Sequence, residues 1–138
     1  MPAPRRRNER GTLPWAAHRE PQPINIPEWM EGARCTETDA ELFARWTDFL
    51  PKRDNDMPYT SGPYTLSRLF LVHQMLQPKS VVEIGFNLGH SAVMWLEMGV
   101  AHVTSIDVSQ HPKVAAAAAV MGERYGSRFA FKRPGELV

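Results

Sequence analysis

Cysteine is nearly missing from this sequence of 138 residues: Cys35 stands alone, so no disulfide can form within the chain. Nothing in it matches a Cys/His pattern with zinc-ligand spacing. No window approaches the roughly 18 consecutive apolar residues of a membrane-spanning helix. The formal net charge is only +1. These absences argue against a disulfide scaffold, a zinc module and a membrane protein, and they favour a reducing, cytoplasmic compartment.

The composition that remains is typical of a soluble globular protein, with 43% hydrophobic and 22% charged residues. The length allows one hydrophobic core. We divide the chain into a Pro/Arg-rich arm over residues 1–37 and an α/β domain over residues 38–138. Six of the twelve prolines lie in residues 1–27, and five arginines oppose two glutamates in residues 1–24. Because proline removes backbone donors, the arm is expected to be irregular or extended.

The basic arm leaves three interpretations open. It is a solvated tail, a segment that contacts nucleic acid or a protein partner, or a targeting segment. A secretory signal is disfavoured because no apolar stretch follows the basic residues.

Two helices are predicted before the first strand. The first begins near Thr38, whose capping box with Glu41 would satisfy two free amides, and it ends at Pro51. The second spans Tyr64 to Leu76. A polar loop from Lys52 to Pro63 separates the two helices.

Strands and helices then alternate as β-α-β-α-β. The connecting helices begin at Gly89 or His90 and at Pro112, and they end at Gly99 and Gly126. Right-handed crossovers place the strands side by side in the order 3-2-1. The fold class is therefore α/β, a Rossmann-like, partial doubly wound parallel sheet with N-terminal helices. The first strand, rich in Val, is expected to be central and buried on both faces. The strands are expected at Ser80–Ile84, Ala101–Asp107 and Arg128–Lys132.

The segment between the first two strands carries the functional motif. Gly85 follows the first strand, where a side chain would block the close approach of a ligand, and Gly89 lies where the helix begins. Glu83, at the strand end, can direct its carboxylate toward a cationic or hydrogen-donating group. Asp107 lies 22 residues after Gly85, a spacing at which an acid accepts hydrogen bonds from ribose hydroxyls. A nucleoside-bearing ligand is therefore expected across these strand ends.

The motif differs from the dinucleotide fingerprint. Gly85 and Gly89 form Gly-x-x-x-Gly, and Asn87 occupies the position of the glycine that lets the backbone meet a pyrophosphate. Two carboxylates at the strand ends also repel phosphates. A ligand with an amino group, a positive centre and a ribose but no phosphate fits better, and S-adenosylmethionine has these groups. A nucleotide- or NAD-binding domain is the weakest alternative because of Asn87.

The segment Glu83–Ala92, followed by Val103–Asp107, resembles the first two motifs of class I S-adenosylmethionine-dependent methyltransferases. The resemblance covers about Ser61 to Gly135 and is nearest to small-molecule O-methyltransferases. It implies S-adenosylmethionine as the cofactor and a small molecule as the methyl acceptor. It also implies roles for seven residues: Glu83 and Gly85 line the methionine part, Phe86, Asn87 and Gly89 form the loop around it, Ser91 supports the methionine end, and Asp107 holds the ribose.

The resemblance extends only over an N-terminal, cofactor-binding half. Family members continue after the third strand with Gly-Asp-Ser, whose acid faces the adenine, and Glu136 is the substitute at that place here. The later strands, which carry catalytic or metal-binding acids, are not in the matched part, so no catalytic residue and no metal ligand is assigned. Two functions stay open: methyl transfer, or a non-catalytic module of the same fold whose basic arm contacts RNA or a protein partner.

A partial sheet leaves its first strand as an apolar edge, and such edges invite association. Three arrangements would cover this edge: the remainder of a longer enzyme, a second copy or another protein, or the N-terminal helices and the arm.

The site residues also have purely structural interpretations. Glu83 is alternatively a strand-end acid that caps a neighbouring helix, and Asp107 is alternatively the N-cap of the helix that follows it. His90 and His111 flank the expected cleft. We expect both histidines to be solvent-exposed or capping residues and not general bases.

Overall fold

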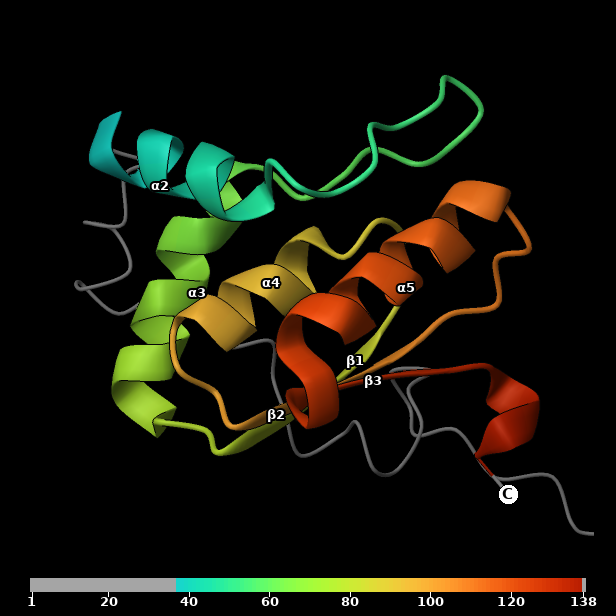
Figure 1. Ribbon diagram of the computed structural model, residues 1–138. Coiled ribbons are helices and arrows are strands. Elements are labelled where there is room, and N and C mark those ends of the chain that lie inside the picture. Colours follow the sequence, from blue (N-terminus) through green and yellow to red (C-terminus); the bar gives the residue numbers. More distant parts are fainter. Residues whose placement is uncertain (1–36, 138) are drawn as a thin grey trace, which may run out of the picture. The chain divides into compact units, whose positions relative to one another are not determined.

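The computed structural model describes residues 37–137 (Figure 1). Residues 1–36 of the predicted arm, with the contacts expected of it, lie outside the described residues. The elements follow one another as α2 (Glu37–Thr47), α3 (Pro63–Leu76), β1 (Ser80–Ile84), α4 (His90–Glu97), β2 (His102–Ile106), α5 (Pro112–Tyr125), η1 (Gly126–Arg128), β3 (Phe129–Lys132) and η2 (Pro134–Glu136).

The three strands form one parallel sheet in the order β1-β2-β3. The register places Val81 beside Val103, and Val103 beside Phe129. This is the predicted order, and it confirms the partial doubly wound α/β class. All three strands therefore direct their carboxyl ends to the same edge of the sheet, which positions the site described below.

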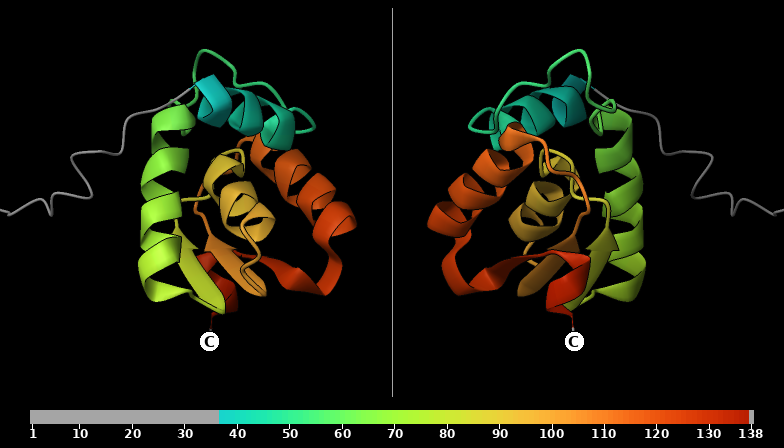
Figure 2. Two further views of the ribbon diagram at one scale, coloured as in Figure 1. Left: turned by 90° about the vertical axis from the view of Figure 1, so that its left-hand side faces the viewer. Right: turned by 90° about the vertical axis from the view of Figure 1, so that its right-hand side faces the viewer.

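The described helices form a layer on one face of the sheet. In Figure 2, α3, α4 and α5 lie on the same side of the strands, and α2 packs against α3 and α4. The middle of helix α4 is apolar on every side, and its residues Ala92 to Leu96 are all buried. Such a helix is stable only between other layers, here between the sheet and the two N-terminal helices. The core thus centres on α4.

Strand β1 differs from its prediction. Its residues alternate in exposure: Val81 and Glu83 are partly buried, whereas Val82 is 68% and Ile84 is 89% exposed. A strand buried on both faces needs helices on both sides and neighbours at both edges. Among the described residues, helices cover one face only and β2 is the one neighbour of β1. The expectation of burial on both faces is therefore wrong for residues 37–137, whereas the expectation that this strand is an apolar edge of the partial sheet is confirmed.

Most helix boundaries agree with the predicted ones. Pro112 opens α5, and Gly99 and Gly126, with φ of +95° and +57°, follow the ends of α4 and α5. Helix α2 differs at both ends, because it begins at Glu37, which places Thr38 inside the first turn and not at the cap, and it ends at Thr47, before Pro51. None of the helices described in residues 37–137 is long and apolar enough to cross a membrane.

Candidate functional site

The turn from β1 into α4 leaves open space above Gly85. Gly85 has φ +93°, a conformation that L side chains rarely adopt, and its N–H donates to the Ile106 carbonyl at 2.7 Å. No atom lies within 4 Å of the position that a Cβ would take. As predicted, no side chain fills the space over this glycine.

Glycine is needed at position 89 for a different physical reason than at position 85. It is the N-cap of α4 with φ +90°, and an added Cβ would lie 2.9 Å from Cε2 of the Phe86 ring. The Phe86 side chain is 2% exposed and packs with the rings of Phe129 and Phe131. Gly89 is therefore fixed by close packing, and Phe86 offers its backbone, not its ring, to the loop.

The carboxylate of Asp107 holds the glycine loop. Its Oδ2 accepts from the backbone N–H groups of Phe86 and Asn87, both at 2.8 Å, and its Oδ1 accepts from Ser109 N–H at 2.7 Å. Partial burial opposes ionisation, but these N–H groups and the Arg133 guanidinium outweigh it and lower the pKa of Asp107. Because Asp107 bonds the loop and not the start of α5, the N-cap alternative is wrong.

His111 takes the capping role at α5. Its Nδ1 accepts from Lys113 N–H at 3.1 Å, as expected of a capping histidine.

Glu83 is partly buried at the end of β1, and its carboxylate accepts hydrogen bonds from two serines. Ser105 Oγ donates to Oε1 at 2.6 Å and Ser91 Oγ donates to Oε2 at 2.8 Å. Burial raises the pKa of Glu83, although both hydrogen bonds favour the ionised form. The partners are side-chain hydroxyls, so Glu83 does not cap a helix through backbone amides. Ser105 is its register partner on β2.

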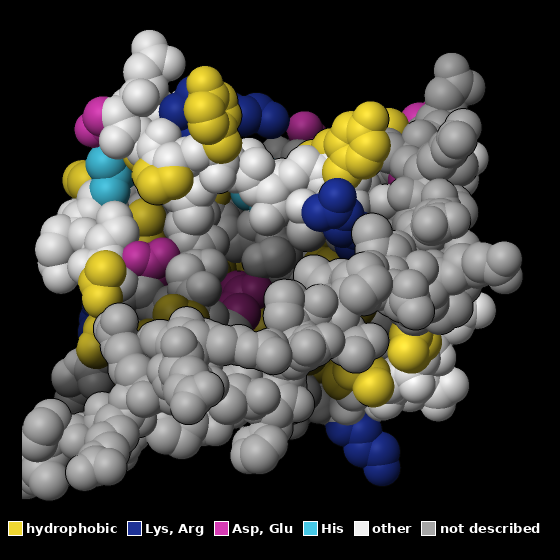
Figure 3. All heavy atoms as spheres, turned by 180° about the vertical axis from the view of Figure 1, so that it is seen from behind, with side chains coloured by type: hydrophobic (Ala, Val, Ile, Leu, Met, Phe, Trp, Pro, Cys, Tyr) yellow, Lys and Arg dark blue, Asp and Glu magenta, His cyan; other side chains and the backbone are white. Residues whose placement is uncertain are grey.

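A hollow of about 280 Å³ lies at the carboxyl ends of β1 and β2. It brings together five of the seven predicted site residues, whereas Glu83 and Gly89 do not line it. Figure 3 shows the molecule from behind, where the most recessed charged side chain is acidic. The lining residues are Pro58, Tyr59, Thr60, Ser61, Gly85, Phe86, Asn87, Leu88, His90, Ser91 and Asp107.

The loop before α3 supplies a wall of this hollow that the sequence did not indicate. Residues 58–61 line it, and Asn87 Nδ2 donates to the carbonyls of Pro58 at 3.2 Å and Tyr59 at 3.5 Å. Asn87 has φ +51°, which asparagine tolerates better than most residues. The only sequence signal for this wall was the asparagine at a position where a dinucleotide site has glycine.

The same loop is fastened to the start of α5. Lys113 Nζ lies 2.5 Å from Asp54 Oδ1 and donates to the Lys52 carbonyl, and His111 Nε2 lies 3.5 Å from carboxylate oxygens of Asp54 and Asp56. The Lys113 contact lowers the pKa of Asp54.

The three side chains Asp54, Asp56 and His111 are close enough to hold a cation. However, His111 Nδ1 accepts a hydrogen bond, so the hydrogen of the neutral ring is on Nε2, which faces the aspartates. A nitrogen that carries a hydrogen cannot bind a metal ion, and Asp54 is already bound to a lysine. These three side chains therefore suit a cluster of hydrogen bonds and ion pairs, and we assign no metal to them.

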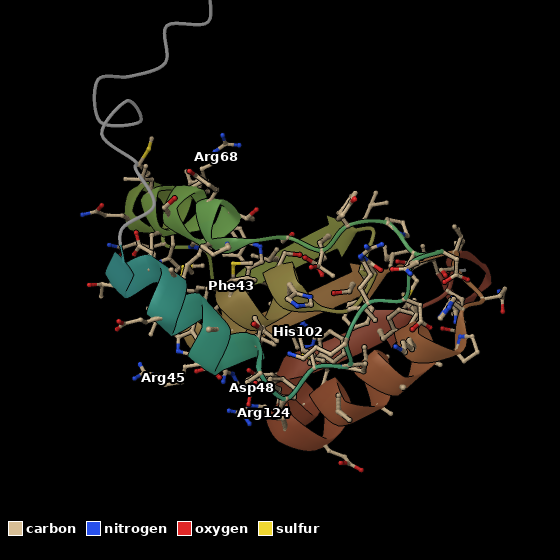
Figure 4. The ribbon with its side chains drawn as sticks, turned by 90° about the horizontal axis from the view of Figure 1, so that it is seen from above. Phe43, Arg45, Asp48, Arg68, His102 and Arg124 are labelled. Atoms are coloured by element: carbon tan, nitrogen blue, oxygen red, sulfur yellow. The ribbon has the colours of Figure 1, made fainter. Side chains whose placement is uncertain are left out.

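His90 departs from its prediction. Its ring stacks on Phe43 with centroids 5.9 Å apart, and Nδ1 is buried without a partner among the described residues. Figure 4 shows Phe43 on the side of α2 that faces α4. Arg45, also on α2, and Arg68, on α3, point outward, away from α4. Burial, with Lys52 nearby, lowers the pKa of His90 to about 4. The expectation of an exposed or capping histidine is wrong, because α2 covers the ring.

Glu136 stabilises the turn that follows β3. Its Oε2 accepts from the Arg133 N–H at 2.9 Å, while the Arg133 side chain donates to the Ser109 carbonyl. Glu136 does not line the hollow.

No family model and no curated protein matches the sequence. Among solved structures, the crystal structure of the SAH-bound Podospora anserina methyltransferase PaMTH1 is similar, with a TM-score of 0.54 and 23% identity over 78% of this chain. The likeness shows the fold. It is a partial, Rossmann-like methyltransferase fold, and the match spans 46% of the PaMTH1 chain, less than half of its length.

Proposed function

We propose that this chain binds S-adenosylmethionine and supplies the cofactor-binding half of a methyltransferase that acts on a small-molecule acceptor. One observation carries the proposal: Asp107 and the open space above Gly85 meet in a single hollow at the strand ends. The similarity to an SAH-bound methyltransferase supports the same ligand class.

The chemistry of the hollow favours a ribose without phosphate. Of the described residues that line it, none is lysine or arginine, so nothing there balances a phosphate charge. Asp107 accepts two hydrogen bonds at Oδ2 but one at Oδ1, which leaves a lone pair of Oδ1 for a ribose hydroxyl. A second hydroxyl would compete with the loop amides for the same carboxylate.

The described residues act on the donor side of the reaction. When bound, S-adenosylmethionine would supply the methyl group of its sulfonium for in-line transfer to the acceptor nucleophile, with the thioether S-adenosylhomocysteine as the leaving group. For such a step the protein chiefly aligns the reactants and excludes water. Asp107 and the glycine loop would fix the nucleoside, while residues 58–61 close one side. His90, with a pKa of about 4, is a weak base at neutral pH and is not assigned to proton removal.

Calorimetry with S-adenosylmethionine and S-adenosylhomocysteine tests the proposal. We expect both to bind, Asp107→Asn to weaken both by about tenfold or more because a charged hydrogen bond is lost, and Gly85→Val to abolish binding by filling the hollow. Glu123→Ala, which removes an exposed carboxylate on α5, should bind like the wild type. A folded wild-type protein that binds neither compound would overturn the proposal, and it would favour a non-catalytic module.

A further inference from the structure

The loop that forms one wall of the hollow also contacts the start of α5, and Figure 1 shows it reaching over that helix. We call residues 52–61 the covering loop. At its tip, Asp54 and Asp56 each place a carboxylate oxygen 3.5 Å from His111 Nε2. At its far end, residues 58–61 line the hollow. The covering loop therefore connects His111 with the hollow.

Arg53 couples the tip of the covering loop to the part that lines the hollow. Its Nη1 donates to the carbonyls of Asp54 at 3.1 Å and Met57 at 2.7 Å, and its guanidinium lies 4.4 Å from the centre of the Tyr59 ring. Between the two parts, the Met57 side chain is buried in the core. A displacement of the tip therefore disturbs the contacts that hold Tyr59 at the hollow.

His111 contacts two elements with one ring. Nδ1 accepts from the Lys113 N–H at 3.1 Å and caps α5, while Nε2, which carries the hydrogen of the neutral ring, faces the two aspartates. Protonation adds a hydrogen to Nδ1, which can then no longer accept from the Lys113 N–H. It also places a positive charge in front of two carboxylates. The same proton thus weakens the cap and strengthens the contact with the covering loop.

The other charged groups around the ring preserve this direction. Lys113, on the same helix, contacts Asp54 and lowers its pKa, so this carboxylate is ionised at neutral pH and well below it. Arg53 bonds carbonyls of the covering loop, and Arg133, from the end of β3, donates to the Ser109 carbonyl. Lysine and arginine keep their charge between about pH 5 and 8, the interval in which histidine ordinarily changes its own.

We propose that His111 is a pH-sensitive switch: as the pH falls, its ring leaves the α5 cap and holds the covering loop closed over the hollow. The consequence for ligands rests on the proposed function, because the loop lines the same hollow, whereas the motion of the loop does not depend on it. Since both aspartates are exposed, the change is small, about two- to fivefold, which is the range of exposed ion pairs.

Amide hydrogen exchange on the full chain without ligand tests the switch, with His111→Asn as the variant. Asparagine also caps helices well but does not titrate, so α5 keeps a cap. Comparison at equal pH removes the dependence of intrinsic exchange on pH. At about pH 5.5, where histidine is largely charged, the covering loop of the wild type should exchange about two- to fivefold more slowly than that of His111→Asn. At about pH 8 the difference should shrink.

Two further variants separate the ring's contact from general charge effects. Asp56→Asn removes one of the two carboxylates that face the ring and is an exposed substitution that leaves the core intact. It should reduce the pH-dependent difference. Glu123→Gln removes the same charge from an exposed position of α5 and should leave the difference unchanged.

The dissociation rate of S-adenosylhomocysteine, measured by surface plasmon resonance, tests the consequence for the hollow. The rate for His111→Asn divided by that for the wild type should rise about two- to fivefold from about pH 8 to about pH 5.5. Glu83 is present in both proteins, so its titration cancels in this ratio.

The outcomes distinguish the two proposals. If loop exchange responds to pH equally in the wild type, His111→Asn and Asp56→Asn, the switch is overturned, whether or not a ligand binds. If S-adenosylhomocysteine binds but the ratio of dissociation rates is constant, His111 does not control the hollow, and the proposed function stands. If loop exchange changes as expected but S-adenosylhomocysteine does not bind, the proposed function fails and the switch in the covering loop stands.

Discussion

Gly89 and Gly99 share a backbone conformation but not an environment. Their φ angles are +90° and +95°, yet a Cβ at Gly89 would meet the Phe86 ring at 2.9 Å while a Cβ at Gly99 would meet nothing within 4 Å. A left-handed conformation costs an alanine about 1–2 kcal/mol, and overpacking a tight contact adds roughly 1–3 kcal/mol. The two costs can therefore be separated in this chain.

We expect Gly89→Ala to lower the free energy of unfolding by about 2–5 kcal/mol, and Gly99→Ala by about 1–2 kcal/mol. Urea unfolding followed by circular dichroism measures both. Equal losses in the two variants would show that the Phe86 ring moves aside and that the conformation alone makes Gly89 necessary.

Glu83 makes stability depend on pH in the direction opposite to an ordinary surface acid. Burial raises the pKa of Glu83 in the folded chain, whereas in the unfolded chain the pKa is about 4.3. The unfolded state therefore loses this proton first, and the folded state loses relative stability as pH rises from the unfolded to the folded pKa. Above the folded pKa the loss is complete and constant.

Glu83→Gln removes this titration. We expect the melting temperature of the wild type minus that of Glu83→Gln to fall as pH is raised from 4, and then to level off. Thermal melts in a pH series measure the difference. A difference that increases over this range would mean that the two serines stabilise the ionised form more than burial opposes it.

At this scale the sequence predicted the residues whose role depends on local spacing. Gly85 and Asp107 meet at the hollow because a strand, a turn and a second strand have near-constant geometry. It did not predict that Glu83 turns to Ser105, since that contact depends on the register of β1 against β2. Nor did it predict the burial of His90, which depends on Phe43 from a helix far earlier in the chain.

At the scale of elements, strands and helices were predicted well because their signals are local. Runs of Val and Ile, the glycines after α4 and α5, and Pro112 at the start of α5 each act within a few residues. The loop of residues 51–62 was predicted only as a polar connection. Its place over the hollow depends on Asn87, His111 and Lys113, which come later in the sequence, and no local pattern records such contacts.

This loop offers a prediction about local motion. The Lys113 ammonium donates hydrogen bonds to Asp54 Oδ1 and to the Lys52 carbonyl, and both contacts are lost in Lys113→Ala. Because exposed ion pairs contribute little to global stability, we expect an almost unchanged melting temperature but faster amide hydrogen exchange in residues 52–60. Lys79→Ala, in the exposed turn before β1, is the control. Unchanged exchange in the loop would show that the contacts of His111 and Asn87 suffice to hold it.

At the scale of the whole molecule, the exposure of one face of β1 is the feature that the sequence pattern did not predict. The sequence of β1 is that of a strand with neighbours on all sides, and the PaMTH1 chain, with more than twice the matched length, shares the fold. In residues 37–137, Val82 and Ile84 are exposed instead. Hydrophobic content predicts that a strand is buried, but it does not tell which part of an assembly buries it.

We propose that two copies of this chain associate through β1 when no other segment covers it, because an apolar strand edge is a template for pairing. Light scattering during size-exclusion chromatography should then show a mean mass that rises with concentration. Ile84→Lys should reduce this rise, since it places a charge on the exposed apolar side chain of the edge strand. Val108→Lys is the matched control: Val108 is 73% exposed against 89% for Ile84, but it lies beyond the end of β2 and outside the sheet. Neither substitution removes a buried contact, so both variants should melt close to the wild type. A constant monomer mass in the wild type, or an equal response of the two variants, would show that β1 does not mediate association.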